Sequence, residues 1–496
     1  MTTASGSYNN PLVVITPPNT SIKADDVKVG LFYVNTADNA VFSLNSPAGN
    51  FASNAIQVGA DIHQRGQSTF DAPKPQYSIH LDDDPPGDAH FLDMKHGGKH
   101  WVFNDCGFFD HSLVRNAMAF HLQRKMGQWA PRSKFFELFI ASDPNGTYDA
   151  DSPDTYYQDV LKLVEADPGT YYQGIYLNME KIRKESHRID LPEYASTTPA
   201  VGPIIMQVNW PNSRDPDKYE KMNAYNNLAL TSHVYLYQPK SKYFTDDSNA
   251  NQAQLEPIQH WYNVNGTSGW GGNFNTAYGD ISGSRTIPDS LWTSIHDTTD
   301  YASFATYFLL NELARDPDGY HKSTFMYKTA DTPASGTTAA VPGKCFGGPL
   351  WDKNKSFGNP YNQYAQDYKS PEGWLFTMLA NGQSPCWWHV MIKDPVFCKE
   401  VWTQWTTYTQ EGGPLNATYI NAYVNGDDGL VNDLEATGAI ARDLARYPLP
   451  NLPNGSSTTY GDQVDALTTY VTARLKWMGD NLADLLQTQS GYTATS

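Results

Sequence analysis

The chain has 496 residues, which is more than a single hydrophobic core usually supports, so we expect two lobes, over residues 1–285 and 286–496. It carries 35 lysines and arginines against 53 aspartates and glutamates, and the net charge of −18 argues against nucleic acid as the main partner. No apolar run approaches the length of a membrane span, and the first residues show no charged-then-apolar signal region.

Composition also bears on the compartment. Only 18% of the residues are charged while 13% are aromatic, a balance that favours an extracytoplasmic or surface-associated protein. The four cysteines show no CxxC spacing, so neither a disulfide scaffold nor structural zinc is indicated. Cys386 and Cys398 could pair if the protein is secreted.

The N-terminal region is predicted to be rich in β-structure. Residues 12–15, 27–34 and 56–62 are β-branched and apolar runs separated by Pro, Asn and Gly turns. Arg65 then precedes a glycine and a loop, and Lys74 stands just before an alternating strand pattern. Glycine lets a backbone approach a phosphate and Lys supplies a point charge, although a solvated turn is an open alternative.

Further along, apolar stripes predict a helix over 110–126 and strands over 135–140 and 172–179. The last strand ends at Glu180, which could pair with Lys74 or with a neighbouring cation.

The middle and end of the chain alternate between weak and strong patterns. A strand is predicted over 233–238, and residues 263–284, rich in Asn, Gly and Ser, are interpreted as a long surface loop between the lobes. Helical stripes over 395–408 and 463–486 predict that the second lobe is mainly helical.

The stretch from residue 311 to residue 359 holds the candidate chemistry. A helical stripe ends at Pro317, just before Asp318, and an alternating strand pattern covers 323–328. Asp352 follows a Gly-Gly-Pro break, at an expected strand-to-loop corner. Two carboxylates brought to one cleft would suit phosphoryl transfer, which needs one to orient the acceptor hydroxyl and others to hold magnesium. The alternative is that both are ordinary loop aspartates.

Five segments in this order resemble one family. They are RGQSTFDAPKPQYSIHL, WVFNDCGFFDHSLVRNAMAFHLQRKMGQWAPRSKFFELFI, YYQGIYLNMEKIRKESHRIDL, NELARDPDGYHKSTFMYK and GGPLWDKNKSFGN. Together with the later RLKWMGDNL they resemble the CotH kinase family over roughly residues 10–485. Five linked motifs are far more specific than any one of them.

The resemblance implies an α+β fold of two lobes like a divergent protein kinase, with a β-rich N-terminal lobe and a mainly helical C-terminal lobe. It also implies transfer of the ATP γ-phosphoryl group, with Mg²⁺ or Mn²⁺, to Ser or Thr of a substrate protein. The acidic charge of this chain favours a substrate protein that is basic. By this resemblance Asp318 orients the acceptor and Asp352 binds metal, with Asn354 as a possible second ligand. The expected phosphate-site residues are Lys74, Arg65 and Glu180.

Three departures bear on activity. The family often shows two adjacent lysines where this chain has Lys74 alone, and Lys353 places a cation beside the expected metal site. Ser323 stands where a typical kinase has a metal-binding Asn. A pseudokinase-like structural or adhesive module of a coat or surface assembly is therefore the alternative function. A metal-dependent hydrolase is a third, because paired carboxylates serve that chemistry too.

Overall fold

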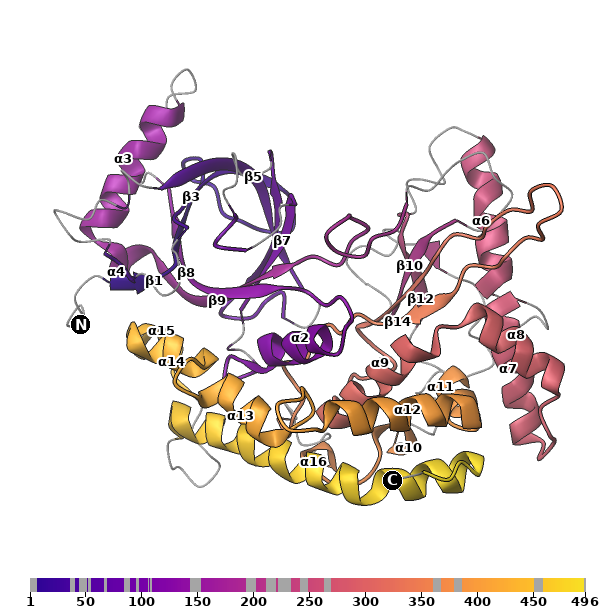
Figure 1. The fold of residues 1–496 in the computed structure, drawn as a ribbon. Helices are drawn as coiled ribbons and strands as arrows, with labels where there is room; N and C mark the ends of the chain where they lie inside the picture. Colours follow the sequence, from indigo (N-terminus) through magenta and orange to yellow (C-terminus); the bar gives the residue numbers. More distant parts are fainter. Residues whose placement is uncertain are drawn as a thin grey trace. The chain divides into compact units, whose positions relative to one another are not determined.

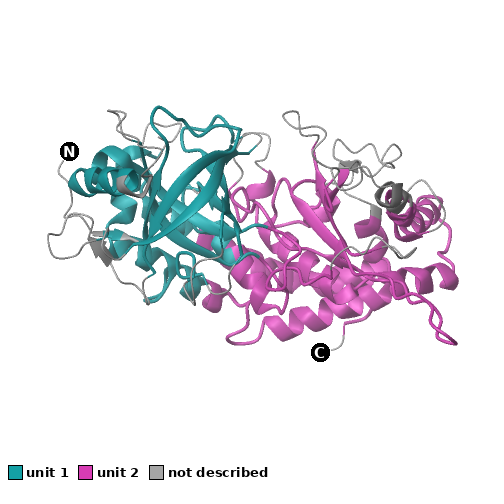
Figure 2. Ribbon diagram, turned by 90° about the horizontal axis from the view of Figure 1, so that it is seen from above, with its two compact units in different colours: residues 1–118, 131–181, 421–466 teal, residues 119–130, 182–420, 467–496 magenta. Residues whose placement is uncertain are grey.

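The computed structural model divides the chain into two compact units, which Figure 2 colours separately. Unit 1 comprises residues 1–118, 131–181 and 421–466, and unit 2 comprises residues 119–130, 182–420 and 467–496. No helix of the described residues is long and apolar enough to cross a membrane. The structure describes residues 7–35, 41–43, 51, 55–66, 69–83, 90–94, 98–105, 107, 109–142, 153–192, 202–210, 220–221, 233–240, 249–262, 269–359, 367–378, 386–449 and 458–494.

Unit 1 is built on a closed barrel of seven strands (Figure 1). Its strand order is β2-β3-β5-β6-β7-β9-β8, and every neighbouring pair is antiparallel except β2 and β8, whose parallel pairing closes the barrel. The strands are β2 (Pro11–Ile15), β3 (Val27–Tyr33), β5 (Ile56–Arg65), β6 (Gln76–Leu81), β7 (His100–Asn104), β8 (Ser133–Ala141) and β9 (Tyr172–Glu180). A short pair of strands, β1 (Ser7–Asn9) and β4 (Val41–Ser43), lies outside the barrel order.

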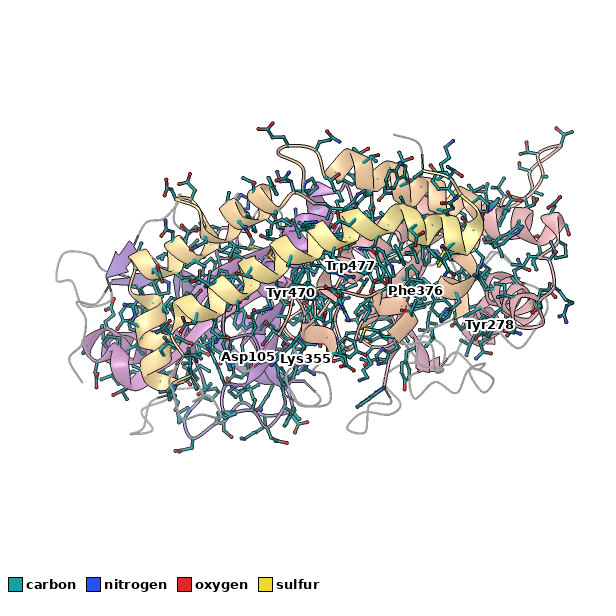
Figure 3. All side chains as sticks on the ribbon, turned by 90° about the horizontal axis from the view of Figure 1, so that it is seen from below. Asp105, Tyr278, Lys355, Phe376, Tyr470 and Trp477 are labelled. Carbon is teal, nitrogen blue, oxygen red and sulfur yellow. The ribbon has the colours of Figure 1, made fainter. Side chains whose placement is uncertain are left out.

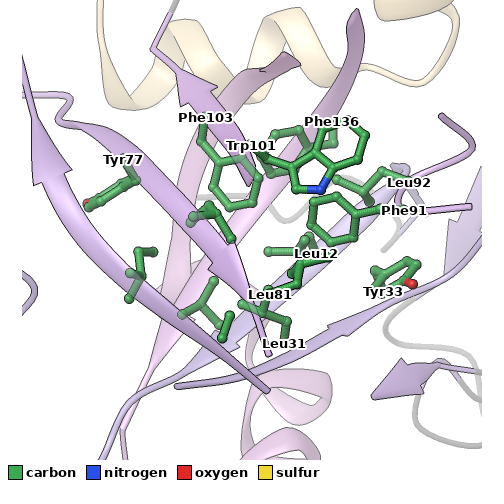
Figure 4. Close-up of a cluster of buried hydrophobic side chains, with 14 of the residues drawn as sticks. Leu12, Leu31, Tyr33, Tyr77, Leu81, Phe91, Leu92, Trp101, Phe103 and Phe136 are labelled. Carbon is green, nitrogen blue, oxygen red and sulfur yellow. The ribbon is translucent and has the colours of Figure 1, made fainter. Parts of the chain in front are cut away.

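The barrel interior is a packed apolar core (Figure 4). Alternate residues of each strand face inward, as the period of two along a strand requires. Trp101 and Phe103 of β7 lie against Phe136 of β8, and the ring centroids of Phe103 and Phe136 are 4.7 Å apart. Burying each such ring contributes about 1.5–3 kcal/mol, so this core is a main source of the unit's stability.

Helices cover the outside of the barrel. α3 (Pro153–Ala166) packs Tyr156, Val160 and Val164 on outward-facing residues of the barrel strands, and α4 (Pro168–Tyr171) follows it. The later segment of unit 1 adds α14 (Leu430–Ala436) and α15 (Ala439–Arg446). Three helices continue across the division between units, namely α2 (Arg115–Lys125), α13 (Ala417–Asn425) and α16 (Tyr460–Ser490).

The expected kinase-like fold is wrong. The structure is α+β, with strands at the N-terminal end and helices at the C-terminal end, but the strands close into a barrel that is not a kinase-like lobe. Closure depends on pairing Pro11–Ile15 with residues 137–141, more than a hundred positions later. Strand patterns alone indicate each strand but carry no information on a partner so distant.

Unit 2 contains a five-stranded antiparallel sheet in the order β11-β12-β10-β13-β14. Its strands lie on both sides of residue 285, the position at which the sequence analysis divided the chain. They are β10 (Ile204–Asn209), β11 (Glu220–Lys221), β12 (His233–Gln238), β13 (Thr324–Lys328) and β14 (Cys345–Gly347).

Helices make up most of the rest of unit 2. They are α6 (Asn249–Tyr262), α7 (Gly269–Ser282), α8 (Asp289–Thr298), α9 (Tyr301–Ala314), α10 (Leu375–Met378), α11 (Cys386–Met391) and α12 (Pro395–Tyr408). The predicted surface loop over 263–284 is wrong where the structure describes it, because α7 occupies most of that stretch. Its buried face is Trp270, Phe274 and Ala277, a helical spacing that the surrounding glycines obscured. Cys398 is a free thiol in the structure, and its Sγ–H donates to the Ile392 carbonyl at 3.3 Å. Its pairing with Cys386 in a secreted protein stays a prediction, because the Cys386 side chain lies outside the described residues.

Candidate active site

The first candidate carboxylate, Asp318, lies in the loop that follows helix α9. The Asp300 carboxylate caps the helix by accepting the Ser303 N–H at 2.8 Å, and every residue from Ser303 to Ala314 is buried. The helix ends where Arg315 adopts a left-handed conformation with φ 44°, and Pro317 follows two residues later. The loop bearing Asp318 therefore starts from a rigid, buried element.

Asp316 holds this loop in place and also pairs with Lys353, the lysine next to the expected metal ligand Asp352. Its Oδ1 accepts the Asp318 N–H at 2.9 Å, and its Oδ2 lies 2.6 Å from Lys353 Nζ. Both side chains are fully or almost fully buried. Burial works to lower the pKa of Lys353, but Asp316, together with Tyr307 and Asp352, outweighs burial, and the pKa is raised. The charge of Lys353 is therefore matched inside the core by Asp316.

Asp318 lies in a strongly cationic environment. Lys322 Nζ donates to its Oδ1 at 2.8 Å, and Lys355 Nζ donates to its Oδ2 at 3.3 Å. Burial works to raise the pKa of Asp318, but Lys355 and Lys322 lower it to about 2. With 19% of its side chain exposed, Asp318 is a carboxylate at neutral pH that solvent still reaches.

The structure brings Asp352 into the same neighbourhood. Ser323 Oγ donates to Asp352 Oδ2 at 3.3 Å, and both residues have left-handed backbones, with φ 46° and 59°. Burial works to lower the pKa of Lys355, while Asp318 and then Asp352 raise it. Lys355, labelled in Figure 3, thus responds to both carboxylates. Asp352 follows an irregular segment, because β14 ends at Gly347, so the expected strand-to-loop corner is not present.

Asn354 contributes an unusual acceptor two residues beyond Asp352. The residue is 2% exposed, and its side-chain Oδ1 is buried without a hydrogen-bond donor among the described residues. A buried amide oxygen without a donor is costly, and amide and carboxylate oxygens are ligands that Mg²⁺ accepts. No group of three or more His, Cys, Asp or Glu side chains in the described ranges is arranged to hold a metal ion.

A buried network fixes the other side of the Asp318 loop. Glu312 of α9 accepts the N–H groups of Leu375 at 2.6 Å and Phe376 at 3.0 Å, and it accepts the Tyr320 hydroxyl at 3.0 Å. Arg474 of α16 donates to the Glu312 carbonyl at 2.9 Å. The Arg474 guanidinium carbon also lies 4.9 Å from the centroid of the Trp477 ring. Figure 3 labels Trp477 and Phe376.

This network gives a role to the C-terminal RLKWMGDNL segment. Arg474 also donates to the carbonyls of Pro371 at 2.9 Å and Gly373 at 2.7 Å, so one side chain ties α16 to α9 and to the segment before α10. Burial raises the pKa of Glu312, and Arg474 opposes that rise. Arg474 is therefore a positioning residue for the loop that contains Tyr320 and Asp318.

Lys74 lies in unit 1 and has a carboxylate partner that the sequence did not suggest. Its Nζ is 2.7 Å from Asp443 Oδ1, and both side chains are at most 5% exposed. Its Nζ also lies 5.2 Å from the Tyr176 ring centroid and 5.1 Å from that of Tyr447. Asp443 Oδ1 additionally accepts the Ile175 N–H at 2.7 Å, so the pair is anchored to β9.

A glycine makes room for this pair. Gly174 of β9 has φ 107°, a conformation that disfavours side chains. A Cβ atom there would overlap Asp443 Oδ1 and would lie 3.0 Å from Lys74 Cε. A cavity of about 380 Å³ lies beside the pair within unit 1. Apart from Lys74, Asp443 and Arg446, its walls are largely apolar, including Leu113, Ile440, Leu444, Pro448 and Leu449.

Glu180 and Arg65 have other contacts. Glu180 is fully buried and forms a bidentate pair with Arg132, at 3.0 Å to Nε and 2.5 Å to Nη2. Arg65, at the end of β5, donates to Gln76 Oε1 at 3.4 Å. Lys74 therefore pairs with Asp443, and Glu180 pairs with Arg132, in place of the expected pairing of Lys74 with Glu180.

Comparison with known families agrees with the sequence motifs. Residues 62–478 match the family model described as CotH kinase protein. The chain belongs to the CotH kinase family. A search of curated proteins found no match. The family that the sequence analysis named is confirmed, and the matched residues of this CotH family chain include all six candidate site residues.

Sequence reasoning missed Asp316, Lys355 and Asp443. Asp316 and Lys355 stand inside the motifs, but only Lys353, which is adjacent to Asp352, was considered there. A charge count over DPDGYHK and WDKNK would have shown matched cations and anions. Asp443 gave no signal, because it comes from a helix 369 positions after Lys74 and no local pattern links the two.

Proposed function

We propose that this CotH family protein is a Ser/Thr protein kinase that transfers the γ-phosphoryl group of ATP to a protein hydroxyl with Mg²⁺ or Mn²⁺. The observation that carries the proposal is the cluster in unit 2, where Asp318 and Asp352 both act on Lys355 and the buried Asn354 amide oxygen has no donor among the described residues. Phosphoryl transfer depends mainly on positioning and charge, which this cluster supplies.

Asp318 is proposed to orient the acceptor hydroxyl. A carboxylate with a pKa of about 2 is ionised throughout the neutral range, so it accepts a hydrogen bond from a Ser or Thr hydroxyl. It is a weak proton acceptor near neutral pH, because a general base works best when its pKa is near the working pH. Its role is therefore alignment of the attacking oxygen, which a loose phosphoryl-transfer transition state chiefly requires.

The oxygen donors of the cluster fit a hard divalent cation. Asp352 and Asn354 would hold the metal, and the Asn354 Oδ1 is an acceptor that such an ion would satisfy. Mg²⁺ is commonly held by one or two carboxylates together with phosphate oxygens, so two protein ligands suffice. The bound metal would neutralise charge on the phosphates during transfer.

The cations are proposed to contact phosphate. Lys355 is poised between two carboxylates, so a phosphate group that enters would compete with Asp318 and Asp352 for its ammonium. By the family resemblance, Lys74, with Arg65 as a supporting cation, remains a proposed phosphate contact. The buried Asp443 then holds the Lys74 ammonium in position.

The acceptor is proposed to be a basic protein rich in Ser and Thr. The chain has a net charge of −18, which favours association with a cationic partner. The pseudokinase alternative rested partly on Lys353, and the burial of that lysine against Asp316 removes one reason for it.

Labelled ATP, Mg²⁺ or Mn²⁺ and a basic Ser-rich protein test the proposal. We expect Asp318→Asn to lower transfer at least about 100-fold while nucleotide still raises the melting temperature. Asp352→Asn should lose both transfer and the metal-dependent shift. Asp297→Asn, at an exposed position of α8, is the matched control and should behave as wild type.

The outcomes separate the alternatives. Nucleotide binding without transfer would favour the pseudokinase module. Neither binding nor transfer, in a folded protein, would refute the kinase proposal. Wild-type transfer by Asp318→Asn or Asp352→Asn would remove that residue from its role.

A further inference from the structure

A second cavity, of about 500 Å³, lies within unit 2 and shares no lining residue with the Asp318 and Asp352 cluster. One wall is a single face of α12, because Glu400, Thr403, Gln404 and Thr407 follow helical i, i+3, i+4, i+7 spacing. The other walls are the N-terminal residues of α9, the turn after α2 and the β13–β14 edge of the sheet. Figure 1 labels α2, α9, α12 and β14.

The polar wall of this cavity is held in place by hydrogen bonds. Thr306 Oγ1 donates to Gln404 Oε1 at 2.7 Å, and Gln404 Nε2 donates to the Ala302 carbonyl at 2.8 Å and to Glu400 Oε1 at 2.9 Å. These bonds engage both ends of the Gln404 amide. The Glu400 carboxylate is thereby fixed in orientation, and it has further lone pairs with which to accept hydrogen bonds.

Flat apolar surfaces stand beside these acceptors. Tyr327 and Phe346, a cross-strand pair of β13 and β14, stack with ring centroids 4.9 Å apart and an interplanar angle of 3°. Trp129 and Tyr408 also line the cavity, and the Tyr408 hydroxyl is fixed by donating to the Met126 carbonyl at 3.0 Å. Aromatic faces with polar groups placed beside them are typical of small-molecule sites.

The charge of the lining selects the ligand. The described residues around the cavity include Asp300 and Glu400 but no Lys, Arg or His, so an anionic ligand such as a phosphate would be repelled. The remaining polar groups are neutral: Gln128 Oε1 accepts from Gln123 Nε2 at 3.0 Å, which leaves the Gln128 amide N–H groups as donors toward a ligand.

A ligand rich in hydroxyls matches this mixture best. Each hydroxyl both donates and accepts, so it can serve carboxylate acceptors and amide donors alike, whereas an ammonium group would use the acceptors alone. The apolar face of a sugar ring would cover aromatic rings that are otherwise in contact with water. We propose that this cavity binds a neutral saccharide, at a site separate from the phosphoryl-transfer cluster.

Titration calorimetry of the full chain with cellotetraose, chitotetraose and maltotetraose tests the proposal. We expect at least one of them to bind with a Kd of about 1 mM or tighter. Thr407→Trp fills the cavity from an exposed position of α12, and it should weaken binding more than tenfold. Glu400→Gln, which keeps the shape and removes the charge, should weaken it less. Lys399→Trp, at an exposed position that does not line the cavity, is the matched control.

Three results would overturn the proposal. The first is that none of the tetrasaccharides binds the folded protein. The second is that binding occurs but is unchanged in Thr407→Trp. The third is that spermidine binds and Thr407→Trp abolishes it while the tetrasaccharides do not bind, which would assign the cavity to cations. The calorimetry does not depend on phosphoryl transfer from ATP, so it tests the saccharide site even if the kinase assay fails.

Discussion

Breaking the buried Lys353–Asp316 pair should destabilise the protein strongly. The two charges are 2.6 Å apart, with side-chain exposures of 0% and 1%. Their attraction at an effective dielectric constant of about 20 is about 6 kcal/mol, much of which is offset by the cost of burying both charges. Lys353→Met leaves Asp316 buried without its cation, and we expect the free energy of unfolding to fall by about 3–5 kcal/mol.

A double-mutant cycle isolates the interaction. Asp316→Asn combined with Lys353→Met removes both charges, so its loss should be smaller than the sum of the single losses, with a coupling of about 2–3 kcal/mol. Urea unfolding followed by tryptophan fluorescence measures each value, and the slope should stay constant. The exposed Lys476–Asp480 pair, 76% and 59% exposed, is the matched control and should change stability by less than about 1 kcal/mol.

The same variants show whether Lys353 stabilises the core or binds the nucleotide. If the charge of Lys353 belongs to the core, the double variant should keep nucleotide binding. Wild-type stability in Lys353→Met together with lost nucleotide binding would refute this reasoning, because Lys353 would then serve the ligand and not Asp316.

Three further predictions follow from single residues. Arg474→Met removes the donor to Glu312 and to two loop carbonyls, and it should cost about 3–5 kcal/mol in urea unfolding, whereas Lys476→Met on the same helix should cost little. Asp318 has its pKa lowered from 3.8 to about 2, so it contributes about 2 kcal/mol of stability above pH 4 that is lost as the pH falls through 2. The stability difference between wild type and Asp318→Asn should therefore shrink over that interval, and a constant difference would contradict the assignment. Gly174→Ala should lower the melting temperature more than Gly127→Ala, because both have positive φ but only position 174 meets neighbouring atoms within 4 Å. Equal shifts would show that the Lys74–Asp443 pair tolerates the methyl group.

Local patterns predicted the elements well. Strand β12 and helix α12 have the predicted bounds, His233–Gln238 and Pro395–Tyr408, because a clear period and flanking breakers define both. The helix predicted over 110–126 begins later, at Arg115, because Leu113 has a left-handed backbone with φ 67° and the Asp110 carboxylate accepts the N–H groups of Ser112 and Arg115 in a turn before the helix. Pairings between distant segments were not accessible in this way, and they decide both the barrel closure and the Lys74–Asp443 pair.

The candidate site was predictable only in part. The motifs marked Asp318 and Asp352, and the structure brings both to Lys355. What the motifs did not indicate was which lysine would be buried, because Lys353 and Lys355 differ by two positions and side-chain direction in an irregular segment follows no fixed period. Lys353 is the buried lysine because it pairs with Asp316, and this pairing depends on burial and not on sequence spacing.

A crystal structure with a non-hydrolysable ATP analogue and Mg²⁺ tests the central claim most directly. We predict that Asp352 and the Asn354 amide oxygen bind the metal, that Lys355 contacts phosphate, and that Asp318 faces the γ-phosphate. A nucleotide bound elsewhere, with Asp352 still held by Ser323 and Lys355 still paired with Asp318, would contradict the account.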